Sequence, residues 1–267
     1  TGRSETSTYN GFNQLTAQTL NEAGTVTDLG YEYYPDGIRG VKTVDSVPTV
    51  YLVNSGYVVA EYRESTLTSV YLWGANLIKA GIGSETSYYL YNAHGDVVQL
   101  TDENGAVTKS YTYDAFGAQD EPSVYDLNPF RYCGEYYDRE SGTYYLRARY
   151  YNPGTGRFTQ EDSVRGTVRA FPNGKSTPRL ESQNLYAYAY GNPNQFRDSS
   201  GHAGELTLTW TSGMWWLCAV DGPFLPIGDA IYVIGIGLMS IADAIATIGV
   251  DNVARMASEL PEVASKA

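Results

Sequence analysis

Two aspartates and two arginines in the second half of the chain are suited to hydrolysing a peptide bond. Asp162 lies in the segment EDSVRG, and Asp198 lies in the segment RDSSGH. Two carboxylates that share one proton acquire different pKa values, so one can accept a proton from water while the other donates to the carbonyl. Arg149 or Arg157 could hold a carboxylate or polarise that carbonyl through charge-assisted hydrogen bonds. The alternative for each aspartate is structural, with its side chain capping a turn of its own loop.

The segment RARYYNPGTGRFTQED, residues 147–162, has to position these groups. Aromatic and polar residues alternate in its first part, and the run Asn-Pro-Gly-Thr-Gly has the composition of a tight turn. We therefore predict a strand over residues 143–151 and a turn over residues 152–156. The residues after the turn then bring Arg157 and Asp162 to the start of a loop.

A short repeat runs along the first two-thirds of the chain. Tyr91-Asn-Ala-His-Gly95 and Tyr113-Asp-Ala-Phe-Gly117 align with each other, and residues 31–44 and 9–19 carry looser copies. Each copy alternates aromatic and polar residues and then has Asn or Asp, two variable residues and Gly, which is typical of a β-hairpin. We expect the hairpins to form a continuous antiparallel sheet with its tyrosines on one face, so the fold is mainly β.

Composition narrows the classes of function. The 267 residues include 25 Tyr and 28 Gly, which suits strands joined by tight turns. A net charge of −12 argues against nucleic acid as the partner of the β domain, because phosphate binding needs a basic face. Cys133 and Cys218 form neither a disulfide framework nor a metal site in this interpretation, and His94 is expected at the surface of a turn. No cofactor is expected.

These motifs resemble those of the rearrangement-hotspot (Rhs) family of YD-repeat proteins. NPFRYCGEYYDRESGTYYLRARYYNPGTGRFTQEDS, residues 128–163, is similar to the start of the Rhs repeat-associated core domain, and NLYAYAYGNPNQFRDSSGH, residues 184–202, is similar to its end. The resemblance covers roughly residues 1–202. It implies a YD-repeat sheet over residues 1–127, a core domain over residues 128–202 and a variable pre-toxin or toxin-leading segment over residues 203–267.

The resemblance also implies a function and partners. In Rhs proteins the YD repeats wind as a β-spiral into a hollow shell around a C-terminal toxin, and the core domain closes the shell and cuts the chain as an aspartic-type protease. The partners implied are the chain's own C-terminal segment, further YD repeats, and a secretion-system or immunity protein. The first residues, TGRSETSTYN, show no signal-peptide pattern, so we expect the chain to begin partway through a longer polypeptide that is secreted or held at the bacterial cell surface.

The residues of the cleavage site follow from the same resemblance. Asp162 and Asp198 stand where the family has two Asp-Pro-x-Gly motifs, and Asp138 matches an acidic residue implicated in some relatives. The family is cut just after the second motif. The implied catalytic residues are Asp162, Asp198, Asp138, Arg149 and Arg157, and the implied cleavage site is formed by Gly201, His202 and Ala203.

A structural or adhesive YD-repeat segment without catalysis is the alternative function. Ser163 and Ser199 stand where the Rhs motifs have proline, and residues 167–183 form a polar insertion between the two aspartates. Both departures favour the non-catalytic role.

The residues after 202 have a different character. Residues 230–250 have helical spacing, and their uninterrupted apolar run, Ala230–Ala242, would span about 20 Å as a helix, short of the roughly 30 Å hydrocarbon core of a bilayer. We therefore expect a small C-terminal helix, buried or enclosed by the shell and capped by Asp229. Membrane contact of residues 230–250 is the weaker alternative. We recognise no toxin enzyme motif in this region.

Overall fold

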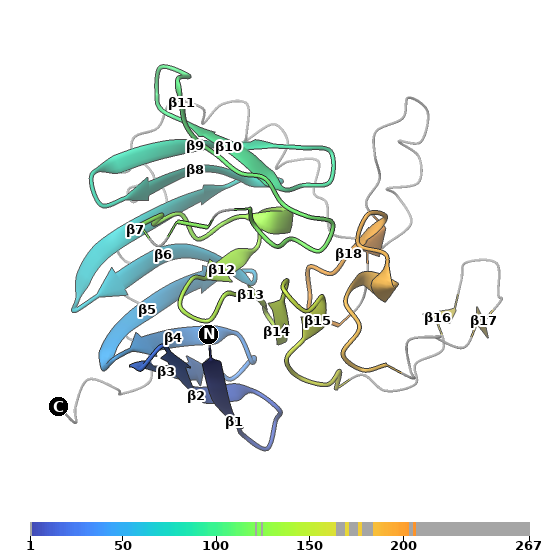
Figure 1. Ribbon diagram of the computed structural model, residues 1–267. Coiled ribbons are helices and arrows are strands. Elements are labelled where there is room, and N and C mark those ends of the chain that lie inside the picture. The colour runs from blue at the N-terminus through green and yellow to red at the C-terminus, as the bar shows by residue number, and fades with distance from the viewer. Residues whose placement is uncertain are drawn as a thin grey trace.

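The computed structural model describes residues 2–120, 122–123, 125–163, 169–170, 176–177, 184–202 and 205–206. These residues form almost entirely antiparallel β-structure (Figure 1), which confirms the predicted mainly β fold. No helix within these ranges has the length and hydropathy needed to cross a membrane. The predicted helix over residues 230–250 lies outside the described residues, as do Ala203 and Cys218.

Eleven strands form one large sheet in which each strand pairs with its neighbours along the chain. Figure 1 shows them stacked in chain order, from β1 at the bottom of the view to β11 at the top. The strands are β1 Arg3–Tyr9, β2 Leu15–Glu22, β3 Thr25–Tyr33, β4 Arg39–Val44, β5 Val47–Asn54, β6 Tyr57–Arg63, β7 Thr66–Trp73, β8 Leu77–Ile82, β9 Glu85–Tyr91, β10 Val97–Thr101 and β11 Val107–Ser110.

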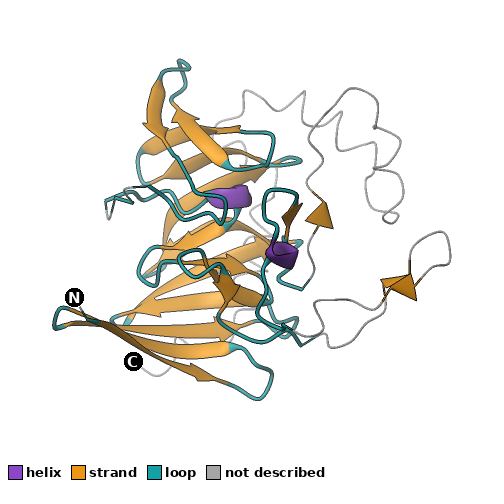
Figure 2. Ribbon diagram, turned by 45° about the vertical axis from the view of Figure 1, so that its right-hand side comes forward, coloured by secondary structure: helices purple, strands orange, loops and turns teal. Residues whose placement is uncertain are grey.

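A second, four-stranded sheet follows the large one and lies against one of its faces (Figures 1 and 2). Its strands are β12 Tyr136–Asp138, β13 Thr143–Leu146, β14 Arg149–Asn152 and β15 Arg157–Phe158. Two strand pairs and two 3-10 turns complete the described structure: β16 Arg169–Ala170 with β17 Ser176–Thr177, β18 Phe196–Arg197 with β19 Glu205–Leu206, η1 Tyr132–Gly134 and η3 Ala189–Gly191.

The repeat forms hairpins because its Asn or Asp side chain closes the turn. Asn92 Oδ1 accepts the backbone N–H groups two and four residues later, at 3.0 and 2.9 Å, and Asp114 Oδ1 does the same at 2.9 Å in both cases. Gly95 and Gly117 follow with φ of +95° and +85°, a left-handed conformation that glycine adopts without strain. The same arrangement recurs at Asn10 and Asp102.

Tyrosines from alternate strands form much of the core. The buried members in the large sheet are Tyr31, Tyr51, Tyr71 and Tyr89. Strand β13 of the second sheet contributes to two clusters, because successive side chains point to opposite faces of a strand. Tyr145 packs into the core of the large sheet, whereas Tyr144 and Leu146 pack into a separate cluster on the other face. The second sheet thus lies between the large sheet and the segment that follows residue 184.

The single strand predicted over residues 143–151 is instead a hairpin. Arg147 has φ of +60° and forms a two-residue turn with Ala148 between β13 and β14. Residue types alone do not predict this turn, because neither arginine nor alanine usually favours a left-handed backbone. The turn places Arg147, Ala148 and Arg149 against residues 199–201.

Candidate active site

Arg149 is the centre of the candidate site. It begins strand β14 and is 4% exposed. Its Nη2 lies 3.1 Å from Asp162 Oδ2 and 3.7 Å from Asp198 Oδ2, so one guanidinium nitrogen faces both carboxylates. Its Nε donates to the carbonyl of Gly201, and its Nη1 donates to the carbonyl of Leu185 at 2.8 Å. The cation offsets the repulsion that two buried carboxylates would otherwise exert on each other.

Asp198 follows β18 and is 3% exposed. Its Oδ1 accepts the backbone N–H groups of Ser200, Gly201 and His202 at 3.2, 2.8 and 3.2 Å. This is the turn-capping geometry considered as the structural alternative, and it involves one carboxylate oxygen while the other faces Arg149. The capped nitrogen of His202 belongs to the peptide bond after Gly201, which is one of the two bonds within the predicted cleavage site of Gly201, His202 and Ala203.

Asp162 reaches the site from the loop after β15. Its backbone N–H donates to the carbonyl of Leu185 at 3.0 Å, which ties the loop to the segment after residue 184. Its Oδ1 lies 3.1 Å from Nδ1 of His202, while its Oδ2 faces Arg149. The carboxylate therefore contacts the Arg149 guanidinium on one side and the His202 imidazole on the other.

Three consecutive carbonyls, the last of which belongs to the predicted cleavage site, are held by three consecutive residues of the β13–β14 hairpin. Arg147 donates to the carbonyl of Ser199, the backbone N–H of Ala148 donates to that of Ser200 at 3.3 Å, and Arg149 donates to that of Gly201. A Cβ atom at Gly201 would lie 2.4 Å from the Leu146 carbonyl oxygen, and φ is +76° there, so the close approach requires glycine.

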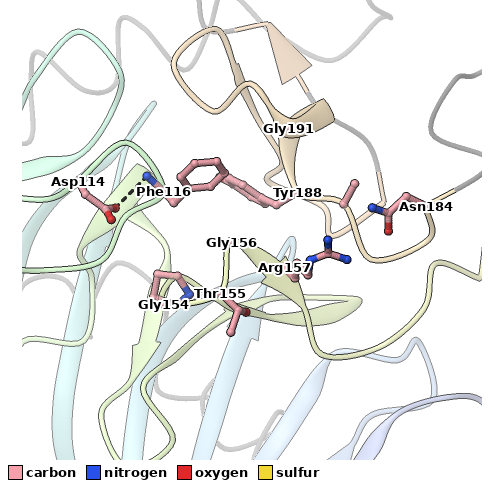
Figure 3. A pocket seen from close by; sticks show the side chains of 11 residues that line it. Asp114, Phe116, Gly154, Thr155, Gly156, Arg157, Asn184, Tyr188 and Gly191 are labelled. Carbon is pink, nitrogen blue, oxygen red and sulfur yellow. Dashed lines mark hydrogen bonds between the residues drawn. The ribbon is translucent and has the colours of Figure 1, made fainter.

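The structure places the other two predicted site residues elsewhere. Asp138, at the end of β12, is completely buried and forms an ion pair with Arg39 and, at 2.9 Å, with Lys42. Arg157 is exposed and lines a hollow of about 370 Å³ together with Asp114 and Tyr188 (Figure 3). The structure thus brings Asp162, Asp198, Arg149, Gly201 and His202 together.

Sequence reasoning missed Glu135. Its Oε2 lies 3.0 Å from Nη1 of Arg147, the nitrogen that also donates to Ser199, and the residue is 8% exposed. Burial raises the pKa of Glu135 to about 7, although the Arg147 guanidinium acts in the opposite direction. Only the folded chain brings Glu135 to this position, and a single glutamate in CGEYY carried no signal of it.

A family model settles the classification of the chain. The model described as Teneurin YD-shell matches residues 61–194, about half of the chain. This chain belongs to the teneurin YD-shell family. The matched part of this YD-shell protein runs from β6 to just beyond η3, so it includes Arg149 and Asp162 and ends before Asp198.

Curated relatives of this YD-shell protein include bacterial nucleases and toxins. The chain is 34% identical over 180 residues to the tRNA3(Ser)-specific nuclease WapA of Bacillus spizizenii, covering 64% of this chain and 7% of that protein. It is 31% identical over 121 residues to the toxin protein Tse5 of Pseudomonas aeruginosa, covering 45% of this chain and 8% of that protein. The chain thus spans less than a tenth of each relative. These matches confirm the predicted relationship to Rhs-type YD-repeat toxins.

Solved structures share the fold of the YD-shell protein. The crystal structure of TcdB2-TccC3-Cdc42 is similar with a TM-score of 0.56 at 19% identity, over 74% of this chain and 10% of that chain. The crystal structure of TcdB2-TccC3 without its hypervariable C-terminal region is similar to the same extent, with a TM-score of 0.56.

Proposed function

We propose that this chain is the part of a secreted or surface-held bacterial Rhs-type toxin that encloses a C-terminal toxin region and separates it by cutting the bond between Gly201 and His202. The toxin relatives support the setting. One observation carries the cleavage proposal: Arg149 contacts the Gly201 carbonyl and both carboxylates at once. The partners in this function are the chain's own residues after 202, further YD repeats, and a secretion-system or immunity protein.

The geometry assigns a role to each group in hydrolysis. Asp162 accepts a proton from the attacking water, whose oxygen bonds to the Gly201 carbonyl carbon. Arg149 Nε stabilises the negative charge that develops on the carbonyl oxygen. Asp198 begins with the single proton that the two carboxylates share, carried on Oδ2 because Oδ1 accepts three N–H groups, and it delivers that proton to the His202 nitrogen as the C–N bond breaks. The products are a carboxyl group on Gly201 and an amino group on His202.

Time-resolved mass spectrometry of the expressed chain tests the proposal. We expect two fragments, with N-terminal sequencing of the smaller one starting at His202. Asp162→Asn and Asp198→Asn should each slow cutting by about 10²–10⁴-fold, because an amide keeps the shape of the side chain but cannot transfer the proton. Asp102→Asn is the matched control, since Asp102 closes a repeat turn with the same hydrogen bonds that an asparagine makes.

A single intact mass in the wild type would instead support the non-catalytic YD-repeat scaffold. One observation favours that alternative: the three N–H groups on Asp198 Oδ1 are sufficient reason for an aspartate in this turn. If both aspartate variants have unchanged circular dichroism and are cut at the wild-type rate, the proposed mechanism is contradicted although the chain is cleaved.

A further inference from the structure

A second group of chemically reactive side chains lies outside the candidate active site. His94 and Asp96 belong to the turn between β9 and β10, and Cys133 belongs to η1. His94 Nδ1 lies 2.9 Å from Asp96 Oδ1 and 3.8 Å from Cys133 Sγ, and all three atoms lie within 4.8 Å of one another. Imidazole nitrogen, carboxylate oxygen and thiolate sulfur are the three ligand types that zinc takes in proteins.

The spacing of the three atoms suits one ion. In a tetrahedral zinc site with Zn–S of about 2.3 Å and Zn–N of about 2.0 Å, neighbouring ligand atoms are roughly 3.2–3.7 Å apart. The two distances from His94 Nδ1 bracket this range, and Asp96 Oδ1 and Cys133 Sγ lie within 4.8 Å of each other. One carboxylate and one thiolate carry two negative charges, which a divalent cation neutralises in this partly buried position.

Hydrogen bonds outside the three atoms orient them as a metal site requires. His94 Nε2 lies 2.8 Å from the carbonyl of Pro193, so a proton on Nε2 leaves the Nδ1 lone pair directed at Asp96 and Cys133. Asp96 Oδ2 accepts from Asn92 at 2.8 Å, and the Cys133 N–H donates to Asp96 Oδ1 at 2.9 Å. Metal-binding histidines and carboxylates have outer partners of this kind.

The same geometry argues against a nucleophilic Cys-His-Asp triad. In such a triad the nucleophile and the orienting carboxylate contact opposite nitrogens of the imidazole. Here Cys133 and Asp96 both approach Nδ1, and Nε2 faces a backbone carbonyl. The base would therefore have no separate nitrogen with which to take the thiol proton.

We propose that His94 Nδ1, Asp96 Oδ1 and Cys133 Sγ bind one divalent transition-metal ion of the zinc class. On binding, the Cys133 thiol loses its proton to solvent and the sulfur forms the metal bond. A fourth position remains for water or for the hydroxyl of Tyr188, which lies 3.7 Å from the sulfur. The ion would join the β9–β10 turn to η1. This role does not depend on the proposed cleavage.

Cobalt(II) titration of the 267-residue chain, stripped of metal by a chelator, tests the site. We expect one Co²⁺ per chain, with a near-ultraviolet thiolate-to-cobalt charge-transfer band that Zn²⁺ displaces. Cys133→Ser should abolish the band, and His94→Gln should weaken Co²⁺ binding at least about 10-fold. The chain has two cysteines and two histidines, so Cys218→Ser and His202→Gln are matched controls that should leave the titration unchanged.

Alkylation mapping tests the site in the wild-type chain, so its result does not depend on whether a variant folds. Zn²⁺ should protect Cys133 of the wild-type chain from iodoacetamide and leave the reaction of Cys218 unchanged, as measured by peptide mass spectrometry. The proposal is overturned by a titration without a thiolate band, by a band that persists in folded Cys133→Ser, or by Zn²⁺ that protects neither cysteine or both equally.

Discussion

The carboxylates of Asp138, Asp162 and Asp198 differ in their surroundings. Asp138 is enclosed by two cations, Arg39 and Lys42, with no exposed surface. Asp162 and Asp198 share the single cation of Arg149, and they contact the imidazole and the backbone N–H of His202, respectively. We therefore expect the Asp138 carboxylate to stabilise the fold, whereas the proposed cleavage uses the other two.

Asp138→Asn tests this division through stability. Burial tends to raise the pKa of Asp138, but Arg39 and Lys42 outweigh it and hold the pKa below its usual value. The carboxylate therefore stabilises the fold above the unfolded pKa of about 3.9, and this stabilisation is lost as the pH falls through the lower folded pKa. We expect the variant to lower the free energy of unfolding by about 3–5 kcal/mol at pH 7, and the difference from wild type to shrink in acid below about pH 4.

Urea unfolding at neutral and acid pH measures both effects. Asp36→Asn is the control, since Asp36 is an exposed turn residue whose side chain caps the N–H of Ile38 at 3.0 Å. It should change stability by less than about 0.5 kcal/mol. Equal losses in the two variants would show that the ion pair with Arg39 and Lys42 does not stabilise the fold.

Sequence reasoning could identify the residues of the site but not all of their neighbours. Asp162, Asp198 and Arg149 were predicted from residue type and motif, and the fold brings them together. Glu135 was missed, and so was the cluster at Cys133, because these contacts form only when segments distant in sequence pack together. The ion pair between Arg39 and Asp138, for example, spans 99 residues.

At the scale of elements, the repeat turns were predictable because each turn stabilises itself. An Asn or Asp oxygen accepts two N–H groups of its own loop, so the local sequence determines the hairpin. The prediction of one strand over residues 143–151 was wrong because the turn at Arg147 depends on residues that are distant in sequence. The left-handed conformation of Arg147 is held by distant groups, namely Glu135 and the Ser199 carbonyl.

Two repeat turns allow a matched test of packing between the repeats and the core. Gly105 and Gly117 end equivalent turns with φ of +80° and +85°, so alanine strains both backbones to a similar extent. A Cβ at Gly117 would lie 2.4 Å from the Tyr132 ring, whereas nothing lies within 4 Å at Gly105. We expect Gly105→Ala to lower the free energy of unfolding by about 1–2 kcal/mol and Gly117→Ala to lower it clearly more, as measured by thermal unfolding. Equal costs would mean that the turn at Gly117 is not packed on η1 in solution.

At the scale of the whole molecule, the large sheet ends in two strands that lack a second partner among the described residues. Strand β1 pairs only with β2 within that part of the chain, and β11 pairs only with β10. Such edges present backbone N–H and C=O groups that can pair with another chain.

We expect residues 1–267 to self-associate in solution. Light scattering at micromolar concentration should give a mass above that of the monomer. The net charge of −12 opposes association, so added salt should increase the mass by screening that charge. A monomer at low and at high salt would show that the edges of β1 and β11 are protected.

The contacts of Arg147, Ala148 and Arg149 with residues 199–201 also determine when, during synthesis, the proposed cleavage site can form. A ribosome makes the β13–β14 hairpin and Asp162 before it makes the segment that they hold. The cleavage proposed here therefore has to wait until Gly201 has left the exit tunnel and docked on the hairpin. In this proposal, only a chain synthesised beyond Gly201 can be cut. A nascent chain that stalls earlier therefore stays uncut on the ribosome.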